Sequence, residues 1–376
     1  MKSTYATAIS LVLWRTNVVA RPISDQTNRA TPDVANSNQT AVIESQPLEP
    51  DVQALNKFLG NGMNSIKNVN PEPKTQIYPK RSDSDAPYSL SEQELRSKIY
   101  FPKTFSSSSN KQPVILIPGT AAMAGSTYRA NLGPLLAESD FADPLWVNIP
   151  DASLSDAQKN SEYVAYAINY VQSSTGKKPA VVAWSQGNLN VQWALKYWPS
   201  TRDAVTDLVA MSPDFHGTKE AFLACKTAAA IIGCTPSVYQ QMYDSQFVRT
   251  LRAKGGDSAY AQRTKLCNLS LAQKLRPFSK TSTELTYQTS SWGVVTHEGM
   301  LYNSLAFALL KDALMNEGPG KLERIDKNVC GDPAAGKLDK IEIKATEAVL
   351  GDAAINVLKY PNKVKREPAI KDYAKQ

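Results

Sequence analysis

The stretch from Ala180 to Tyr197 constrains the fold of this chain more than any other. It begins with small or β-branched residues without a polar interruption, Ala180 to Ala183, which is the pattern of a short strand buried on both faces of a parallel sheet. Beyond Gly187, apolar residues recur at helical spacing. The chain therefore passes from strand to helix within a few residues, and Ser185 stands at the turn between them.

A serine in this position has two interpretations. The small residues Ala183 and Gly187 lie two positions away on either side, and this spacing matches the nucleophile elbow of α/β-hydrolases, a turn too tight for larger side chains. Such a turn lifts the hydroxyl above the sheet edge at the N-terminus of a helix. The alternative is an ordinary N-cap serine. The buried strand, the small flanking residues and the helix together favour the elbow.

Further strands and helices alternate along the chain. Continuous apolar runs predict strands from Val114 to Ile117 and from Leu208 to Met211, and a mostly apolar stretch predicts another from Leu145 to Ile149. A helix is expected after the second of these strands, behind a capping box that starts at Ser155. This alternation predicts a doubly wound and mostly parallel sheet flanked by helices, and together with the elbow at Ser185 it matches the α/β-hydrolase fold.

A serine hydroxyl becomes a good nucleophile only when a neighbouring base takes its proton, and histidine suits that task near neutral pH. The chain has two histidines. His216 follows the turn that ends at Asp214, whereas His297 lies late in the chain, ahead of a helix-like stretch from Met300 to Leu314. The order serine, acid, histidine of α/β-hydrolases favours His297 as the base. His216 is then a surface or supporting residue.

An ester-cleaving serine also needs donors for the oxyanion that develops on the substrate. The backbone N–H of Gln186, directly after Ser185, is one candidate. Thr120 is the other, because it follows the first central strand and offers both a backbone N–H and a hydroxyl. The alternative is that the residues from Pro118 to Thr120 form a turn without a catalytic role.

Several segments carry a more specific pattern. They are Ile117-Pro118-Gly119-Thr120, Ala183-Trp184-Ser185-Gln186-Gly187, Ser212-Pro213-Asp214-Phe215-His216-Gly217-Thr218 and Thr296-His297-Glu298-Gly299. Together they resemble the secreted fungal lipases of the Candida antarctica lipase B type, over roughly residues 113–330.

The resemblance implies a carboxylic ester hydrolase that works through an acyl-serine intermediate. Residue by residue, it implies Ser185 as nucleophile, His297 as base, and Thr120 with Gln186 as the oxyanion hole. It also places Trp184 under the alcohol side of the substrate pocket and Asp214 beside the site.

The substrates implied by the family are lipids or other apolar esters, met at a lipid–water interface. No metal or organic cofactor is expected, because no His, Cys and Asp cluster in the sequence has ligand spacing. Two alternatives stay open: an esterase or acyltransferase dedicated to one metabolite, and a catalytically impaired homologue. The oligomeric state is left open.

The impaired homologue is an alternative because the family's triad acid is missing from the chain as written. In the family this acid lies in a segment that reads Asp-Glu-Ile-Val-Gln-Pro-Gln-Ser-Gly, whereas residues 260–292 are polar and without a convincing strand. The triad acid is therefore unknown, and Glu284, Asp257 and Asp214 are the candidates.

The missing segment reappears in a different reading frame. One synonymous codon choice for Thr264 to Phe278, displaced by two bases, encodes Glu-Ile-Val-Gln-Pro-Gln-Ser-Gly-Thr-Lys-Ala-Ser-Ala-Phe. An Arg263 codon that ends in G completes the preceding Asp. We therefore expect residues 262–291 to be translated out of frame, through misplaced intron boundaries or compensating frameshifts.

The ends of the chain differ in composition from its middle. Residues 1–20 resemble a weak signal peptide, with a soluble tail as the alternative, and imply secretion. Residues 21–85 are rich in Pro, Asn, Ser, Thr and Gln, which predicts a mostly disordered leader or pro-segment with a processing site at Lys80-Arg81. The hydrolase domain is expected over residues 86–376.

Charge and cysteine content bound the remaining possibilities. The net charge of +7 is spread out, without the aromatic-interleaved basic patch of a nucleic-acid binder, so no nucleic-acid partner is expected. Cys225 and Cys234 bracket one short segment and are the expected disulfide in an oxidising compartment. Cys267 is attributed to the wrong frame, and Cys330 is expected to have lost its partner.

Overall fold

The computed structural model describes residues 62–228, 232–267, 282–286, 295–332, 334–336 and 338–375. Within this part, seven strands form one sheet in the order β1-β3-β2-β4-β5-β6-β7. They are β1 (Ile99–Tyr100), β2 (Gln112–Ile117), β3 (Ala142–Val147), β4 (Ala180–Trp184), β5 (Asp207–Met211), β6 (Gln262–Cys267) and β7 (Ser282–Thr286). Neighbouring strands from β3 to β7 are parallel, and β1 pairs with β3 antiparallel. The predicted doubly wound, mostly parallel sheet is confirmed.

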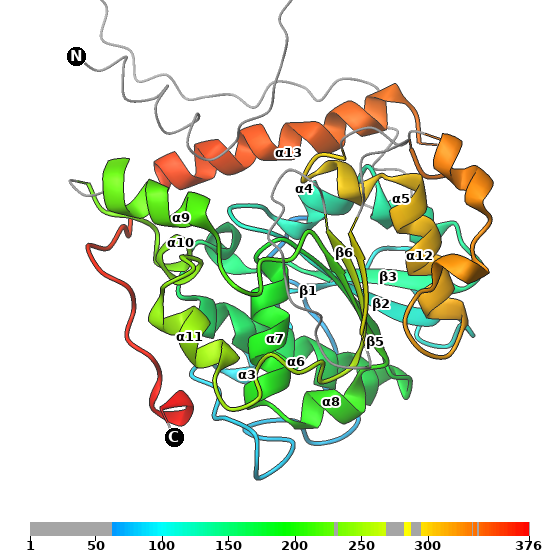
Figure 1. Ribbon diagram of the computed structural model, residues 1–376. Coiled ribbons are helices and arrows are strands. Elements are labelled where there is room, and N and C mark those ends of the chain that lie inside the picture. The colour runs from blue at the N-terminus through cyan, green and yellow to red at the C-terminus, as the bar shows by residue number, and fades with distance from the viewer. Residues whose placement is uncertain are drawn as a thin grey trace, which may run out of the picture.

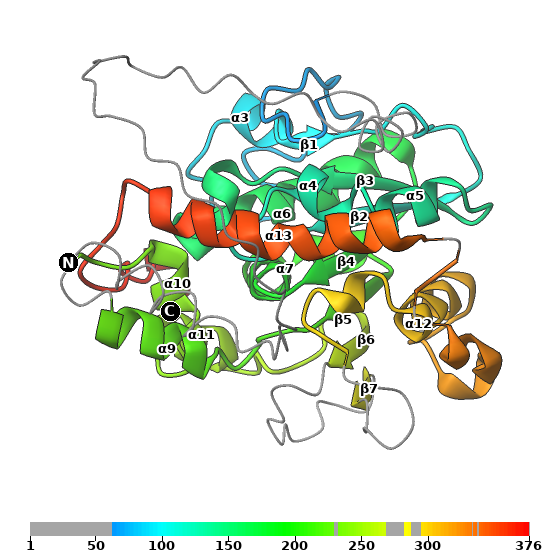
Figure 2. The same cartoon turned by 90° about the horizontal axis from the view of Figure 1, so that it is seen from above.

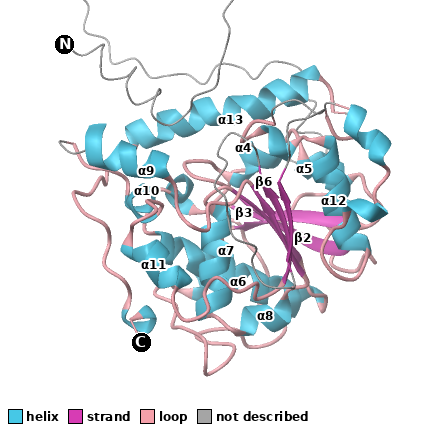
Figure 3. Ribbon diagram, in the orientation of Figure 1, coloured by secondary structure: helices cyan, strands magenta, loops and turns pink. Residues whose placement is uncertain are grey.

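Helices cover both faces of this sheet (Figure 3). One face packs against α3 (Glu92–Arg96), α6 (Ala157–Thr175), α7 (Gly187–Tyr197), α8 (Ser200–Ala204) and α11 (Gln246–Arg252). The other packs against α4 (Ala124–Tyr128), α5 (Leu132–Ala137), α12 (Ser304–Met315) and part of α13 (Lys340–Lys359). A smaller cluster contains α9 (Lys219–Leu223), the π-helix Ala224–Ala228 and α10 (Pro236–Gln240). Short 3-10 turns span Pro150–Ser153, Gly299–Leu301, Leu322–Arg324, Lys327–Gly331 and Asp372–Ala374.

The side chains of β2 explain why the central strands appear in the sequence as unbroken apolar runs. Ile115 and Ile117 join the core under α6 and α7, whereas Val114 and Leu116 join the core under α4, α5 and α12. Successive side chains of a strand point to opposite faces, and here both faces are covered. Every position of the strand from Pro113 to Ile117, where it is buried, is therefore apolar.

Helix α13 lies across the carboxyl ends of the central strands. Figure 1 shows it above α4 and the ends of the strands, and the view from above shows it passing in front of β2 and β4 (Figure 2). It packs against α4 and the turn Gly299–Leu301. This edge is where the carboxyl ends of the parallel strands meet, so α13 borders the place where ligands bind in open α/β sheets.

The start of α6 differs slightly from the prediction. Asp156, one residue after Ser155, is the N-cap, and its carboxylate accepts a hydrogen bond from the Gln158 N–H. The helix ends at Gly176, whose φ of 75° lies in the left-handed region that favours glycine.

The prediction that residues 260–292 lack a strand was wrong, because β6 and β7 lie there. In β6, Arg263 pairs with Leu208 of β5 and Lys265 pairs with Ala210. Both cationic residues are only 1% exposed. Pairing with β5 has overridden a composition that is unfavourable for a buried strand.

Residues 62–85, which the sequence assigned to the leader, belong to the folded domain. The carbonyl of Met63 accepts a 2.8 Å hydrogen bond from the Trp146 indole, and Ile77 and Asp85 are buried. Lys80 is exposed but lies between these anchored residues. The predicted boundary after residue 85 was therefore wrong, and residues 62–85 are assigned to the domain. The predicted signal peptide lies outside the described residues.

The predicted disulfide is confirmed, because Cys225 and Cys234 are joined. A disulfide is consistent with an extracellular, oxidising compartment. Cys330 forms no disulfide within the described residues, and the side chain of Cys267 lies outside them. Among the helices that the structure describes, none combines the length and apolarity needed to span a bilayer.

Candidate active site

Ser185 occupies a strained turn between β4 and α7. Its φ of 53° lies in the left-handed region, which non-glycine residues rarely adopt. The turn is fixed by hydrogen bonds, because the Ser185 N–H donates to the Met211 carbonyl at 3.0 Å and Asn188 Nδ2 donates to the Ser185 carbonyl at 3.0 Å. The local geometry is that of the predicted nucleophile elbow.

Two glycines allow the turn after β2 to approach this elbow. A Cβ on Gly187 would lie 2.7 Å from the carbonyl oxygens of Ile117 and Pro118. A Cβ on Gly119 would lie 3.0 Å from the Cβ of Ser185. Because only glycine fits such contacts, the turn that precedes Thr120 lies directly against the elbow.

His297 also lies beside the elbow. Its carbonyl oxygen accepts a 2.9 Å hydrogen bond from the indole Nε1 of Trp184 and a 3.3 Å bond from Ser212 Oγ. The imidazole and the Trp184 ring have centroids 5.2 Å apart. Part of the residue stays exposed, but desolvation lowers the pKa of the imidazole from 6.5 to about 4. At neutral pH this imidazole is uncharged and able to accept a proton.

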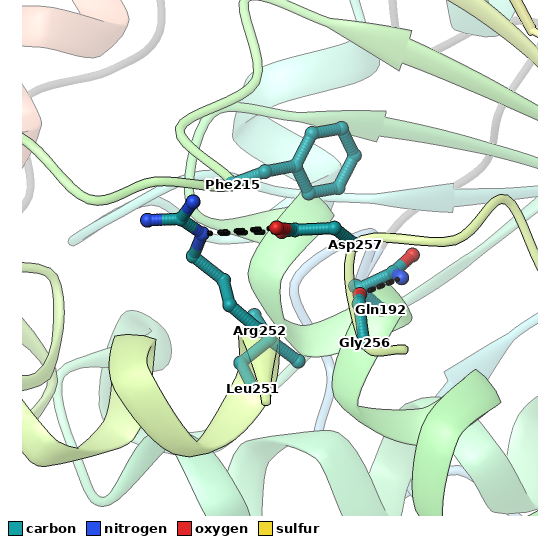
Figure 4. A pocket seen from close by; sticks show the side chains of 6 residues that line it. All are labelled: Gln192, Phe215, Leu251, Arg252, Gly256 and Asp257. Atoms are coloured by element: carbon teal, nitrogen blue, oxygen red, sulfur yellow. Dashed lines mark hydrogen bonds and ion pairs between the residues drawn. The ribbon is translucent and has the colours of Figure 1, made fainter. Parts of the chain in front are cut away.

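His216 belongs to a different group of residues. Its Nε2 lies 3.6 Å from Asp257 Oδ1, and Asp257 also accepts a 3.1 Å hydrogen bond from Arg252 Nε (Figure 4). The adjoining small pocket is lined by Gln192, Phe215, Leu251, Arg252, Gly256 and Asp257, of which only the candidate acid Asp257 was a predicted site residue. Asp257 therefore lies beside His216 and Arg252.

The two predicted oxyanion donors are linked by a residue that the sequence did not single out. The Thr120 hydroxyl donates to Gln241 Oε1 at 2.8 Å, and Gln241 Nε2 donates to Gln186 Oε1 at 2.9 Å. Within the described part of the chain, the backbone N–H groups of Thr120 and Gln186 donate to no protein atom. No sequence signal marks Gln241, because it lies 121 positions from Thr120 and follows an unremarkable helix.

Asp214 lies in the loop after β5. Both of its carboxylate oxygens are buried, and neither has a hydrogen-bond partner among the described residues. Burial raises the pKa of this carboxyl group from 3.8 to about 7. Asp214 therefore carries a proton below neutral pH.

The elbow at Ser185 and the turn at Thr120 meet at the topological switch point of the sheet. Strand β3 lies on one side of β2 and β4 on the other, so the chain changes direction between β2 and β4, where the elbow and Thr120 lie. Of the candidate acids, Asp257 pairs elsewhere and the side chain of Glu284 lies outside the described residues. In the part of the chain that the structure describes, no three His, Cys, Asp or Glu side chains gather as metal ligands would.

The chain is similar to two proteins named lipase B. The lipase B of Pseudozyma antarctica is 28% identical over 284 residues, which are 72% of this chain and 81% of that protein. The crystal structure of Aspergillus fumigatus lipase B is 45% identical, with a TM-score of 0.77, over 83% of this chain and 79% of that one. No protein-family model matches the chain. Both similarities extend over most of the two chains compared.

Proposed function

Because this chain belongs to the lipase B family of α/β-hydrolases and is a serine ester hydrolase, we propose that it cleaves apolar carboxylic esters through an acyl intermediate on Ser185. One observation carries this assignment: the strained Ser185, with a φ of 53°, follows a tryptophan whose indole holds the backbone of His297. A serine on a sharp turn and an imidazole from a distant segment are the pair that acyl transfer requires.

The residues divide the reaction into two steps. Ser185 Oγ attacks the carbonyl carbon of the ester while His297 accepts the hydroxyl proton. The resulting oxyanion is stabilised by the N–H groups of Gln186 and Thr120 and by the Thr120 hydroxyl. The imidazolium returns the proton to the alcohol oxygen as the C–O bond breaks. Water or another alcohol then attacks the acyl-serine, with His297 again as base, and Ser185 is regenerated.

The surroundings of the site favour an apolar substrate at a lipid–water interface. Asn356 of α13 donates a 2.9 Å hydrogen bond to the carbonyl of Ala121, directly after Thr120. On the same stretch of α13, Ile355 and Leu358 are each 47% exposed. Exposed apolar side chains beside a catalytic edge suit contact with a lipid surface.

Secretion is a further part of this proposal. The disulfide between Cys225 and Cys234 supports an oxidising compartment. Protein recovered from the culture medium of the expressing cells is the expected result, and its N-terminal sequence should begin before residue 62. A mature chain that begins at Ser82 would restore the processing site at Lys80-Arg81.

We also propose that residues 262–291 do not have their natural sequence. Arg263 and Lys265 occupy buried positions of a parallel strand, where apolar residues are the rule. The Arg263 guanidinium lies over the Phe215 ring at 4.7 Å, and burial lowers its pKa to about 10. With one synonymous choice of codons, the displaced frame of this segment would encode the acid-bearing sequence of the family. Sequencing the transcript across codons 260–293 tests this, and a message that encodes Thr264 to Phe278 as written would refute it.

The state of this segment affects the expected rate. Loss of the triad acid in a serine hydrolase lowers turnover by about 10⁴-fold, because the imidazole loses its orientation and its charge partner. Asp214 and Glu284 are the substitutes that the written chain offers. The chain with the displaced frame restored should therefore be the faster enzyme.

The proposed function is tested with a serine probe and a panel of esters. A fluorophosphonate should label the parent protein and not the Ser185→Ala variant, while the exposed Ser107→Ala serves as a control that labels normally. Turnover of p-nitrophenyl esters should favour medium or long acyl chains over acetate. Hydrolysis that survives in Ser185→Ala would place the nucleophile elsewhere.

A further inference from the structure

We infer that Gln241 is a positioning residue for the oxyanion hole, which sets the direction of the Thr120 hydroxyl and ties it to the side chain of Gln186. This inference rests on the proposed function, because it has meaning only if Thr120 and Gln186 stabilise an oxyanion. Gln241 touches neither the nucleophile nor the base, and it acts through its two neighbours.

Three hydrogen bonds form one directional chain. Thr120 Oγ1 donates to Gln241 Oε1 at 2.8 Å, Gln241 Nε2 donates to Gln186 Oε1 at 2.9 Å, and Gln186 Nε2 donates to the Ser153 carbonyl at 3.0 Å. Both glutamine side chains are buried. The orientation of a buried amide is strongly constrained by its hydrogen-bond partners, because an unpaired N–H or C=O group cannot bond to water instead.

The direction of the chain is set by two backbone carbonyls, which can only accept hydrogen bonds. The Ser153 carbonyl requires the amide nitrogen of Gln186 to face it, which turns Gln186 Oε1 towards Gln241. The Ser237 carbonyl, 3.1 Å from Gln241 Nε2, orients the second amide independently. Gln241 Oε1 must then face Thr120, and the Thr120 hydroxyl can only donate to it.

The Ser153 carbonyl, which accepts the last of these hydrogen bonds, is itself held in place. Asp151, Ala152 and Ser153 have φ values of 55°, 49° and 64°, a run of left-handed residues without glycine. Such a backbone persists only where its surroundings over-determine it. Asn160 Nδ2 supplies part of that restraint through a 2.9 Å bond to the same Ser153 carbonyl.

This arrangement determines what happens when the oxyanion forms. In the resting enzyme the Thr120 hydroxyl donates to a neutral amide oxygen. A charged oxygen on the substrate is the stronger acceptor, so the hydroxyl turns about its C–O bond and donates to it instead. Gln241 therefore keeps the donor ordered and close to the oxyanion, and it restrains Gln186 at the same time.

A double-mutant cycle tests this role. Thr120→Val removes a donor to the oxyanion, and Gln241→Met leaves that donor without the residue that positions it. Each should therefore lower kcat by about tenfold or more, with KM little changed, because the donor acts on the transition state. The double variant should be only slightly slower than Thr120→Val alone, since Gln241 acts mainly through the Thr120 hydroxyl and only in part through Gln186. Losses that simply multiply would overturn the inference and leave Gln241 as a structural residue.

The adjacent Gln240 provides a matched control. Its amide makes equivalent bonds, 2.7 Å from the Ala157 N–H and 2.7 Å to Asp156 Oδ1, but it does not contact Thr120 or Gln186. Gln240→Met should lower the Tm and leave kcat unchanged, and an equal fall in kcat would contradict the inference. If Gln241→Met is too unstable to assay, the uncharged Gln241→Asn, whose shorter amide does not span Thr120 and Gln186, replaces it in the same cycle, with the same expected non-additivity.

Failure of this inference is distinguishable from failure of the proposed function. An active Ser185→Ala variant would remove the proposed function itself. An inactive Ser185→Ala variant together with a multiplicative cycle would remove only the role of Gln241.

Discussion

The indole Nε1 of Trp184 donates a 2.9 Å hydrogen bond to the carbonyl oxygen of His297, although the two residues are 113 positions apart in the sequence. Trp184 ends β4 and directly precedes Ser185. One bond therefore connects the residue before the proposed nucleophile with the backbone of the proposed base. A late segment of the chain is in this way held at the carboxyl edge of the sheet.

Trp184→Phe removes this bond and keeps an aromatic ring. We expect kcat on a p-nitrophenyl ester to fall roughly tenfold, because a small displacement of a catalytic group is costly in rate. Trp193→Phe is the matched control, since its indole donates a 3.0 Å bond to the Tyr373 hydroxyl away from the elbow. Equal losses in the two variants would mean that the Trp184 bond has no special role.

The low pKa of His297 determines the acid limb of the pH–rate profile. The base must be uncharged to accept a proton, and desolvation lowers the pKa of this imidazole from 6.5 to about 4. The value of kcat/KM should therefore show no fall near pH 6.5, and it should decrease only when the pH drops to about 4. His216→Gln should leave this limb in place. A limb centred near 6.5 in the parent would show that the imidazole is not desolvated.

Asp214 makes stability depend on pH in a defined direction. Its pKa is raised by burial from 3.8 to about 7, so the folded state binds the proton more tightly than the unfolded state. The stability that this group contributes is present below pH 3.8 and is lost as pH rises through about 7. Asp214→Asn stays neutral throughout, so its Tm relative to the parent should rise between these pH values.

Gly119 is required by the contact between two loops. A Cβ at this position would lie 2.8 Å from Trp184 Cε3 and 3.0 Å from Ser185 Cβ, so Gly119→Ala must displace the elbow. We expect at least a hundredfold loss of kcat/KM, roughly the cost of misplacing a nucleophile. Gly351→Ala, in α13 with open space around it, should instead raise stability by up to about 1 kcal/mol. Comparable activity in both variants would contradict the close approach.

Much of the fold could be predicted because it depends on local patterns. Unbroken apolar runs mark β2, β4 and β5, and the small residues around Ser185 mark the turn into α7. The disulfide between Cys225 and Cys234 was likewise predicted from the short spacing of the two residues. By contrast, β6 was missed because Arg263 and Lys265 argue against a strand, and only pairing with β5 places them in one. Residues 62–85 were misassigned because their composition is polar, while their order comes from distant partners such as Trp146.

The sequence by itself determined where a reactive serine can stand, because the strand, the tight turn and the helix around Ser185 are all made by residues next to it in the chain. It also narrowed the choice of base, since only two histidines exist. The tertiary structure alone decided that Trp184 holds His297, that Gln241 joins Thr120 to Gln186, and that Asp214 is buried without a partner. These relationships arise when folding brings together segments from 55 to 121 positions apart or removes a side chain from water, and no local pattern of residues encodes either event.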